Sequence, residues 1–240
     1  MTDRTDLLTA LEDDIIFGVL APGTRLTEDG LMARFGVTRH SVRQALVDLE
    51  RLGIVIRERN IGATVRRYRA DEVRDIYQVR EFLQRQAALM IPFPPPSDLQ
   101  PQLRALNARF SDAQSRGDLR GVHEANDLFH LTFFEACGNR YLVQSIRDYM
   151  NLSLPMRAKS LADADAFRLS SRQHGIMIDL LRDTDRWALA QLCVDHVQPS
   201  KLSYLARVQE TCPADSRPPD AAHHGPDAGS SARTVTLRPG

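Results

Sequence analysis

The chain has 240 residues, of which 42% are hydrophobic and 26% charged, and its formal net charge is zero. These values are typical of one or two globular domains, and they exclude a strongly basic chain, so any nucleic-acid-binding surface must be local. No apolar run approaches the length of a membrane span, and the charged N-terminus is unlike a signal peptide. Three cysteines without a CxxC spacing favour a reduced chain, so we expect a cytoplasmic protein.

Residues 5–20 carry leucines and isoleucines at near-helical spacing with acidic residues between them, which predicts an amphipathic helix. The turn residues Ala21, Pro22 and Gly23 are expected to end this helix, because proline lacks an amide donor and glycine relieves backbone strain. Residues 25–26 then predict a short strand.

Residues 27–50 predict two short helices separated by a tight turn. Gly36 can take a positive φ and stop the first helix, and Thr38 can cap the second by accepting from backbone amides one turn on. In the second helix the apolar residues recur at helical spacing and face inward: Val42, Ala45, Leu46 and Leu49. Its outer face near the N-terminus then carries the polar residues Arg39, His40, Arg43 and Gln44. This end of a recognition helix is the one that meets base edges, so the segment predicts a helix-turn-helix.

Residues 54–57 and 63–66 are rich in β-formers and flank a polar tip that contains Gly62, which predicts a β-hairpin. A hairpin directly after a recognition helix makes a winged helix, whose tip can lie on a phosphate or in the minor groove. The alternative is a hairpin that only covers the core. Residues 25–69 also hold ten arginines against five acidic residues, and this local positive charge favours contact with phosphates.

Three stretches of this segment resemble the GntR family of bacterial transcription regulators: IFGVLAPGTRLTE (16–28), GVTRHSVRQAL (36–46) and NIGATV (60–65). The resemblance covers residues 7–67 and implies DNA binding as a dimer. It places Thr38, Arg39, His40, Ser41 and Arg43 at the DNA and Gly62 at the wing tip. His40 and Ser41 stand where the family more often has Thr-Pro or two threonines, and Gln44 where it usually has Glu, so the operator sequence does not follow. Arg39 and Arg43 suit either a bidentate contact with guanine or a phosphate contact.

Residues 71–210 carry almost no strand signals and predict a helical bundle. The expected helices are 73–89, 99–116, 119–137, 141–154, 157–162, 167–182 and 186–208. Pro155 is expected to break the chain between the fourth and fifth helices. The predicted fold is thus mainly α, with a winged helix-turn-helix domain over residues 1–69 and an all-α domain over residues 70–210. Residues 211–240 predict a disordered tail, in which His223 and His224 are interpreted as an accident of a polar segment.

Four polar residues of the bundle are candidates for a metal site. Asn126 and His130 lie four residues apart and project from one face of a helix, whereas His174 and His196 fall on two other helices. Three imidazoles and an amide inside a bundle can hold a divalent metal with open coordination positions. Surface histidines or hydrogen-bonded core histidines fit the same spacing. Asp127 offers a carboxylate, but it sits about 100° further round the helix and is a poorer candidate.

Several stretches are similar to the effector domain of the FadR subfamily, called the FCD domain: YQVREFL (77–83), NDLFH (126–130), EACGN (135–139), SRQH (171–174) and DHV (195–197). Many members hold a metal with an Asp four residues before the first of three histidines. The resemblance therefore implies a divalent ion, Zn, Ni or similar, at His130, His174 and His196, with Asn126 in the position of the Asp. Asn ligates through its carbonyl oxygen without a charge, so we expect weaker metal binding than with Asp.

Family members with this metal site commonly bind small organic acids, so the resemblance implies a small carboxylate effector. Arg80 is the candidate that binds its carboxylate, because a guanidinium can contact both oxygens. The alternative is that Arg80 forms a structural ion pair with Glu81 or with a neighbouring helix.

Together these patterns predict a ligand-responsive transcription regulator, a repressor as most such proteins are, that binds double-stranded operator DNA as a homodimer. One alternative is a metal-sensing regulator, in which the ion itself is the signal. Another is a metal-dependent hydrolase or lyase with a DNA-binding appendage. The chain has no HExxH, no nucleophile elbow and no phosphate-binding glycine loop, and Glu124 and Glu135 have no evident catalytic partner. We therefore predict no catalytic residues.

Overall fold

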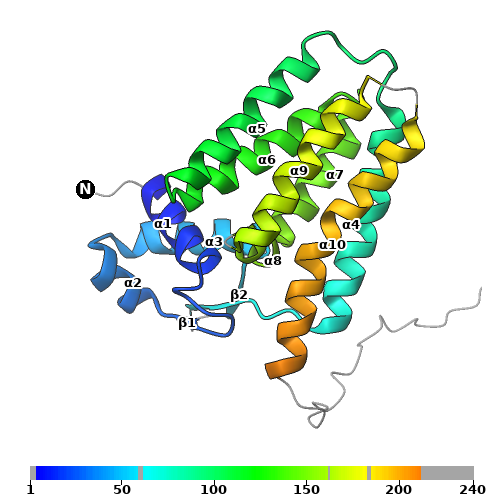
Figure 1. Ribbon diagram of the computed structural model, residues 1–240. Coiled ribbons are helices and arrows are strands. Elements are labelled where there is room, and N and C mark those ends of the chain that lie inside the picture. Colours follow the sequence, from blue (N-terminus) through cyan, green and yellow to red (C-terminus); the bar gives the residue numbers. More distant parts are fainter. Residues whose placement is uncertain (1–3, 59–61, 162, 183–184, 212–240) are drawn as a thin grey trace, which may run out of the picture.

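The computed structural model describes residues 4–58, 62–161, 163–182 and 185–211. It is mainly helical, as predicted, with a small winged helix formed by the N-terminal elements and a larger bundle of long helices beside it (Figure 1). Among the described residues, no helix combines the length and apolar character that a membrane span requires. The first residue of the predicted tail, Thr211, ends the last helix, and the rest of that tail, with His223 and His224, lies outside the described residues.

The winged helix consists of three helices and a three-stranded sheet in the described residues before the bundle. The helices are α1 (Arg4–Ile16), α2 (Glu28–Phe35) and α3 (Arg39–Arg51), and the strands are β1 (Arg25–Leu26), β2 (Val55–Glu58) and β3 (Gly62–Val65). The strand order is β1-β3-β2 with both pairs antiparallel. The inward residues of α3 are fully buried against α1 and the strands, which leaves the opposite face of α3 free of the core.

Local signals of the helix-turn-helix are confirmed. Gly36 takes a φ of 66° and ends α2, and the Thr38 side chain accepts from the Ser41 amide at 3.2 Å to cap α3. The predicted end of the first helix is wrong: α1 ends at Ile16, and a turn with Gly18 at a φ of 81° covers the next residues. The apolar residues of this turn mimic helical spacing, although glycine marks the actual end of the helix.

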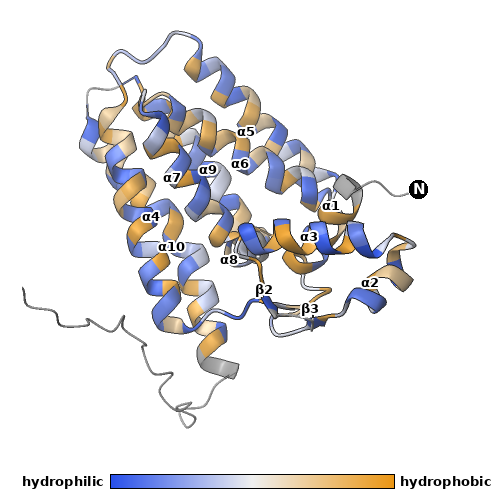
Figure 2. Cartoon of the chain, turned by 180° about the vertical axis from the view of Figure 1, so that it is seen from behind, coloured by the Kyte–Doolittle hydropathy of each residue, from blue (hydrophilic) through white to orange (hydrophobic). Residues whose placement is uncertain are grey.

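The bundle contains seven helices among the described residues from Ala70 onward. They are α4 (Ala70–Met90), α5 (Leu99–Ser115), α6 (Leu119–Glu135), α7 (Arg140–Leu152), α8 (Leu154–Leu161), α9 (Ala164–Leu180) and α10 (Arg186–Thr211). α4 packs along α10, and α5 packs along α6. Orange and blue segments alternate along these helices (Figure 2), as expected where each helix buries one side.

Helix ends in the bundle differ from the predicted ones by up to three residues, and the break predicted at Pro155 lies just before it. α7 ends at Leu152 and α8 starts at Leu154, so Pro155 lies in the first turn of α8. Proline is tolerated there because an amide in the first turn has no intrahelical partner. The start of α8 lies next to the winged helix, and the Leu154 side chain is buried in the same apolar cluster as residues of α1 and α3.

A second contact joins the two parts through Tyr68, which lies between β3 and α4. Its hydroxyl is 2.8 Å from the carbonyl oxygens of both Gly53 and Leu152, so its proton can be donated to either part of the molecule. The ring is 1% exposed and packs edge-on against Tyr204 of α10. The winged helix is therefore joined to the bundle by buried side chains as well as by the chain itself.

Candidate functional site

The outer face of α3 presents the residues that the sequence assigns to DNA. Thr38, Arg39, His40 and Arg43 are exposed and Ser41 is partly exposed. Thr38 and Ser41 also contact each other through their hydroxyls, 2.9 Å apart, at the start of the helix. The exposed side chains therefore gather at the N-terminal end of α3, the end at which a recognition helix meets base edges.

Both arginines of this face are paired with acidic residues at the start of α2. Arg39 donates to Glu28 at 3.2 Å and to Asp29 at 2.6 Å, and Arg43 donates to Glu28 at 2.9 Å. The hydrogen bond from Arg43 and the neighbouring charges hold the pKa of Glu28 below its ordinary value. The arginine side chains remain about half exposed, so these pairs hold them on the surface in reach of a phosphate or a base edge.

Gly62 has a structural reason to be glycine. It is the first residue of β3, opposite Glu58, with a φ of 108°, and a Cβ at this position would collide with the backbone carbonyl of Leu26. The hairpin itself is confirmed, but residues 59–61 at its tip lie outside the described residues. Gly62 therefore permits the close pairing of β3 with β1, whatever the tip contacts.

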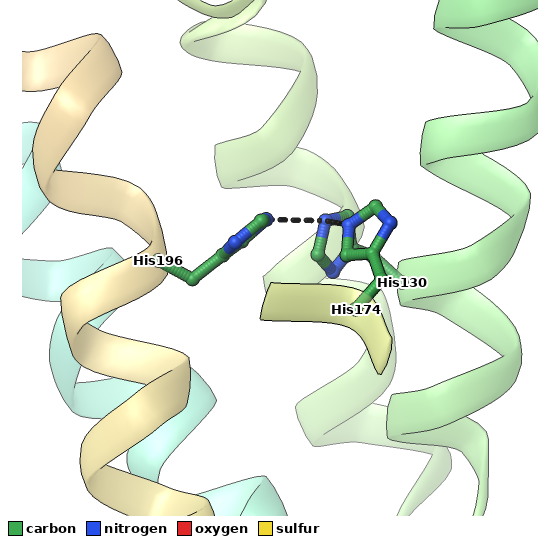
Figure 3. A group of neighbouring side chains, drawn as sticks. All are labelled: His130, His174 and His196. Atoms are coloured by element: carbon green, nitrogen blue, oxygen red, sulfur yellow. Dashed lines mark hydrogen bonds between the residues drawn. The ribbon is translucent and has the colours of Figure 1, made fainter. Parts of the chain in front are cut away.

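Three histidines predicted as metal ligands meet in the bundle. His130 of α6, His174 of α9 and His196 of α10 turn their Nε2 atoms toward one another (Figure 3). The Nε2 of His130 is 3.3 Å from that of His174 and 3.1 Å from that of His196, and all three lie within 4.8 Å of one another. Ligands in a tetrahedral zinc site with ordinary Zn–N bonds are about 3.4 Å apart, so the cluster is close to the required size.

The other ring nitrogens of two histidines are held by amide oxygens. The Nδ1 of His174 is 3.2 Å from Asn107 Oδ1, and the Nδ1 of His196 is 2.8 Å from Gln173 Oε1. An amide oxygen accepts only, so both Nδ1 atoms carry the proton and both Nε2 atoms present a lone pair to His130. One His130 Nε2 proton satisfies at most one of them. The cluster thus has more lone pairs than protons, which is the arrangement that a cation satisfies.

Burial keeps these imidazoles neutral. It lowers the pKa of His196 to about 3, with help from the charges of Arg80 and Arg157, and it lowers the pKa values of His130 and His174 well below 6.5. Neutral imidazole is the form that binds a metal, so the three residues need no deprotonation at neutral pH.

Asn126 lies beside the histidines, and Asp127 is engaged elsewhere. Asn126 is 4% exposed and lines the same small cavity as His130 and His196, and its Nδ2 donates to Asp127 Oδ1 at 3.4 Å, which leaves its own oxygen as an acceptor. Asp127 accepts from Arg157 at 2.5 and 3.2 Å. Burial raises the pKa of Asp127, but the charges of Arg157 and His123, together with the hydrogen bonds that Asp127 accepts, outweigh burial and keep the pKa below its usual value.

Arg80 of α4 lines this cavity, and among the described residues it forms no ion pair with Glu81 or with a neighbouring helix, which was the alternative for it. Glu81 pairs instead with Lys201 at 2.8 Å and accepts from Gln198 at 2.9 Å. Arg80 is 4% exposed, lies over the Tyr77 ring and has no hydrogen-bond partner at Nε or Nη1 among the described residues. Burial, with the nearby charge of Arg157, lowers its pKa to about 10, so it remains a cation at neutral pH.

The cavity is small, and two arginines are among its lining residues. Its volume is about 40 Å³, and its lining includes Arg80, Arg157, Asn126 and two of the histidines. The sequence did not predict three residues of this site, because each contacts a partner that is distant in the chain: Arg157, Asn107 and Gln173. Pro199 is the one residue whose type alone could have pointed to this part of α10. A proline inside a helix removes one helical hydrogen bond, and Pro199 also lines the cavity.

Comparison with known proteins agrees with this architecture. The profile of the gntR family of bacterial regulatory proteins matches residues 5–65, and that of the FCD domain matches residues 75–199. The chain belongs to the gntR family and carries an FCD effector domain. Proteins of this family are transcriptional regulators and not enzymes, and their helix-turn-helix binds DNA.

Two named relatives are regulators as well. The chain is 26% identical over 179 residues to the Nta operon transcriptional regulator of Aminobacter aminovorans, covering 74% of this chain and 82% of the relative. It is 25% identical over 192 residues to the HTH-type transcriptional repressor RspR of Escherichia coli K12, covering 78% and 82%.

Solved structures share the fold. A GntR-type transcriptional regulator from Rhodococcus sp. RHA1 matches with a TM-score of 0.66 and 23% identity, over 85% of this chain and 97% of that one. E. coli McbR/YncC matches with a TM-score of 0.65 and 18% identity, over 88% and 99%. At these identities the likeness concerns the fold alone.

Proposed function

We propose that this regulator is a repressor that binds operator DNA as a homodimer and responds to a small carboxylate held beside a metal ion. The α3 face with Thr38, Arg39, His40, Ser41 and Arg43 would contact the DNA, with the wing beside it. A homodimer is proposed because one recognition helix reads only a few base pairs, and two-fold pairing doubles the site. The repressor role is supported by the similarity to RspR, which is a transcriptional repressor.

The metal would be held by His130, His174 and His196, with the Asn126 oxygen as an additional ligand. The observation that carries this proposal is the convergence of three Nε2 atoms, two of which belong to rings, His174 and His196, whose Nδ1 protons are accepted by Asn107 and Gln173. Zn²⁺ and Ni²⁺ both accept imidazole ligands, and each would leave coordination positions open for a carboxylate oxygen.

Arg80 and Arg157 would bind the carboxylate from the other side of the cavity. Arg80 is a buried cation with two unsatisfied nitrogens, and an anion between it and the metal would supply the missing acceptors. The volume of about 40 Å³ favours an acid of acetate or lactate size unless the cavity widens on binding.

A short helix links this cavity to the winged helix. Arg157 and Leu154 both lie on α8, one turn apart, and Leu154 is buried in the core of the winged helix. Arg157 is held by Asp127 and by the Met150 carbonyl, which it contacts through Nη2 at 3.0 Å. An anion that draws Arg157 away from these partners would shift α8, and with it the packing of Leu154.

The test measures DNA affinity with and without the two ligands. The protein first selects its target from a random-sequence DNA pool, and anisotropy then gives its affinity for that DNA after chelation, with Zn²⁺ or Ni²⁺, and with acetate, lactate or malonate added. We expect the acid to weaken DNA binding only when the metal is present. A response to metal alone would favour the metal-sensing alternative, and no response to any combination would overturn the proposal.

A further inference from the structure

A second cavity, larger than the first, lies where the winged helix meets the bundle. Its volume is about 300 Å³, compared with about 40 Å³ for the cavity beside the histidines. α10 runs to the level of the small sheet (Figure 1), and its last turns form one wall opposite α1 and the turn that follows it. Ligand pockets commonly start at about 300 Å³ and occur preferentially at domain interfaces.

The walls of this interdomain cavity are apolar and come from both parts of the molecule. Ile15, Ile16 and Val65 belong to the winged helix, and Pro155 and Val208 belong to the bundle. An apolar ligand body of matching size would gain free energy by leaving water, in proportion to the area that these side chains cover. The same ligand would touch both parts at once.

Two arginines give the cavity a positive edge, and no acidic residue lines it among the described residues. Arg67 contributes from the link after β3, with its Nη2 3.3 Å from the Pro22 carbonyl, and Arg207 contributes from α10, over the Tyr204 ring. Both arginines are among the residues that line this one cavity. A carboxylate can accept two hydrogen bonds from one guanidinium, so this edge suits a carboxylate head.

We infer that this interdomain cavity is a second ligand site, for an amphipathic aromatic monocarboxylate too large for the cavity beside the histidines. The ligand places its ring system against the apolar walls and its carboxylate between Arg67 and Arg207. Because it contacts the winged helix and the bundle together, it favours one relative placement of the two and thereby changes DNA affinity. This site is independent of the metal and of the acid proposed above.

The test uses the full chain and the fluorescent probe 1-naphthoate, with 1-naphthalenemethanol as the uncharged analogue. We expect saturable binding of naphthoate, and affinity for the alcohol lower by about tenfold, since hydrogen bonds to a charged group are lost. The double substitution Arg67→Gln with Arg207→Gln should weaken naphthoate by a similar factor. Arg69→Gln, an exposed arginine two residues from Arg67, is the matched control and should leave binding unchanged.

A second pair of variants tests the apolar part. Ala21→Trp places a large side chain into the cavity from an exposed position and should abolish naphthoate binding, whereas Val19→Trp, in the same turn but outside the lining, should not. Binding should survive both chelation and His196→Asn. Absence of saturable binding, equal binding of acid and alcohol, binding that survives Ala21→Trp in a folded protein, or loss on chelation would each overturn the inference.

Discussion

The arginines of the recognition helix and those of the bundle cavity are held in different ways. Arg39 and Arg43 share the carboxylates of Glu28 and Asp29 on an open surface, whereas Arg80 is buried with two nitrogens that lack partners among the described residues. An exposed ion pair contributes at most about 1 kcal/mol, so a DNA phosphate would replace the carboxylate at little cost. A buried, unsatisfied cation destabilises the protein until an anion reaches it. The arginines on α3 are therefore suited to exchange a carboxylate for a phosphate, whereas the buried Arg80 is suited to bind one anion and keep it.

The largest expected effect concerns the histidine cluster. His196→Asn removes a lone pair at the meeting point of the three rings, and we expect Zn²⁺ affinity to fall by more than about 100-fold, beyond the usual cost of losing an outer-shell partner. Competition with a chromophoric chelator measures the affinity. His40→Asn, an exposed histidine on α3, is the control. Equal zinc affinity of both variants would show that the cluster is not the metal site.

The next effect concerns the exposed arginines. Arg39→Ala combined with Arg43→Ala should weaken binding to the selected DNA by at least about tenfold and reduce the dependence of affinity on salt, because both cations are lost from the protein–DNA contact. Anisotropy titrations at several salt concentrations measure both quantities. Arg51→Ala at the far end of α3 is the matched control. If control and double variant behave alike, α3 does not enter the groove by its N-terminal half.

Removing the charge of the buried Arg80 should make the protein more stable but weaken its binding of the acid. Arg80→Met keeps the length of the side chain and removes the charge, so we expect the free energy of unfolding to rise by about 1 kcal/mol while acid binding to the metal-loaded protein falls about tenfold. Because the pKa of Arg80 is lowered to about 10, its buried charge destabilises the folded protein at every pH below that value. The gain in unfolding free energy in the variant should therefore be equal at pH 6 and pH 8. Denaturant titrations measure it. Loss of stability in this variant would indicate that Arg80 has a structural partner.

The smallest expected effect concerns Glu28, the acidic partner of the exposed arginines of α3. Glu28→Gln weakens the pairs with Arg39 and Arg43 while keeping the shape of the side chain, and it removes a negative charge from the DNA-facing surface. We expect DNA affinity to rise by up to about threefold, with little change in stability, as is usual for exposed pairs. Asp48→Asn, on α3 beside Arg51, is the control. A fall in affinity would mean that Glu28 orients the arginines for the DNA.

How much could be predicted depended on the distance over which each signal acts. Gly36, Thr38 and the apolar spacing of α3 act within a few residues, and the helix-turn-helix was predicted from them. His130, His174 and His196 lie on three helices, so their spacing was consistent with a metal site but did not require one. The role of Asn107 and Gln173 as acceptors for two of these rings could not be predicted, because each depends on how α5, α9 and α10 pack.

The burial of Leu154 among the core residues of the winged helix has a practical consequence for dissecting the protein. A fragment that ends at residue 69 lacks this side chain, although it contains every element of the winged helix. Filling such a gap with water or leaving it empty costs a few kcal/mol in comparable cores, about as much as many small folds can lose. Anyone who grafts this DNA-reading head onto another sensor should therefore transplant α8, or supply a leucine in its place.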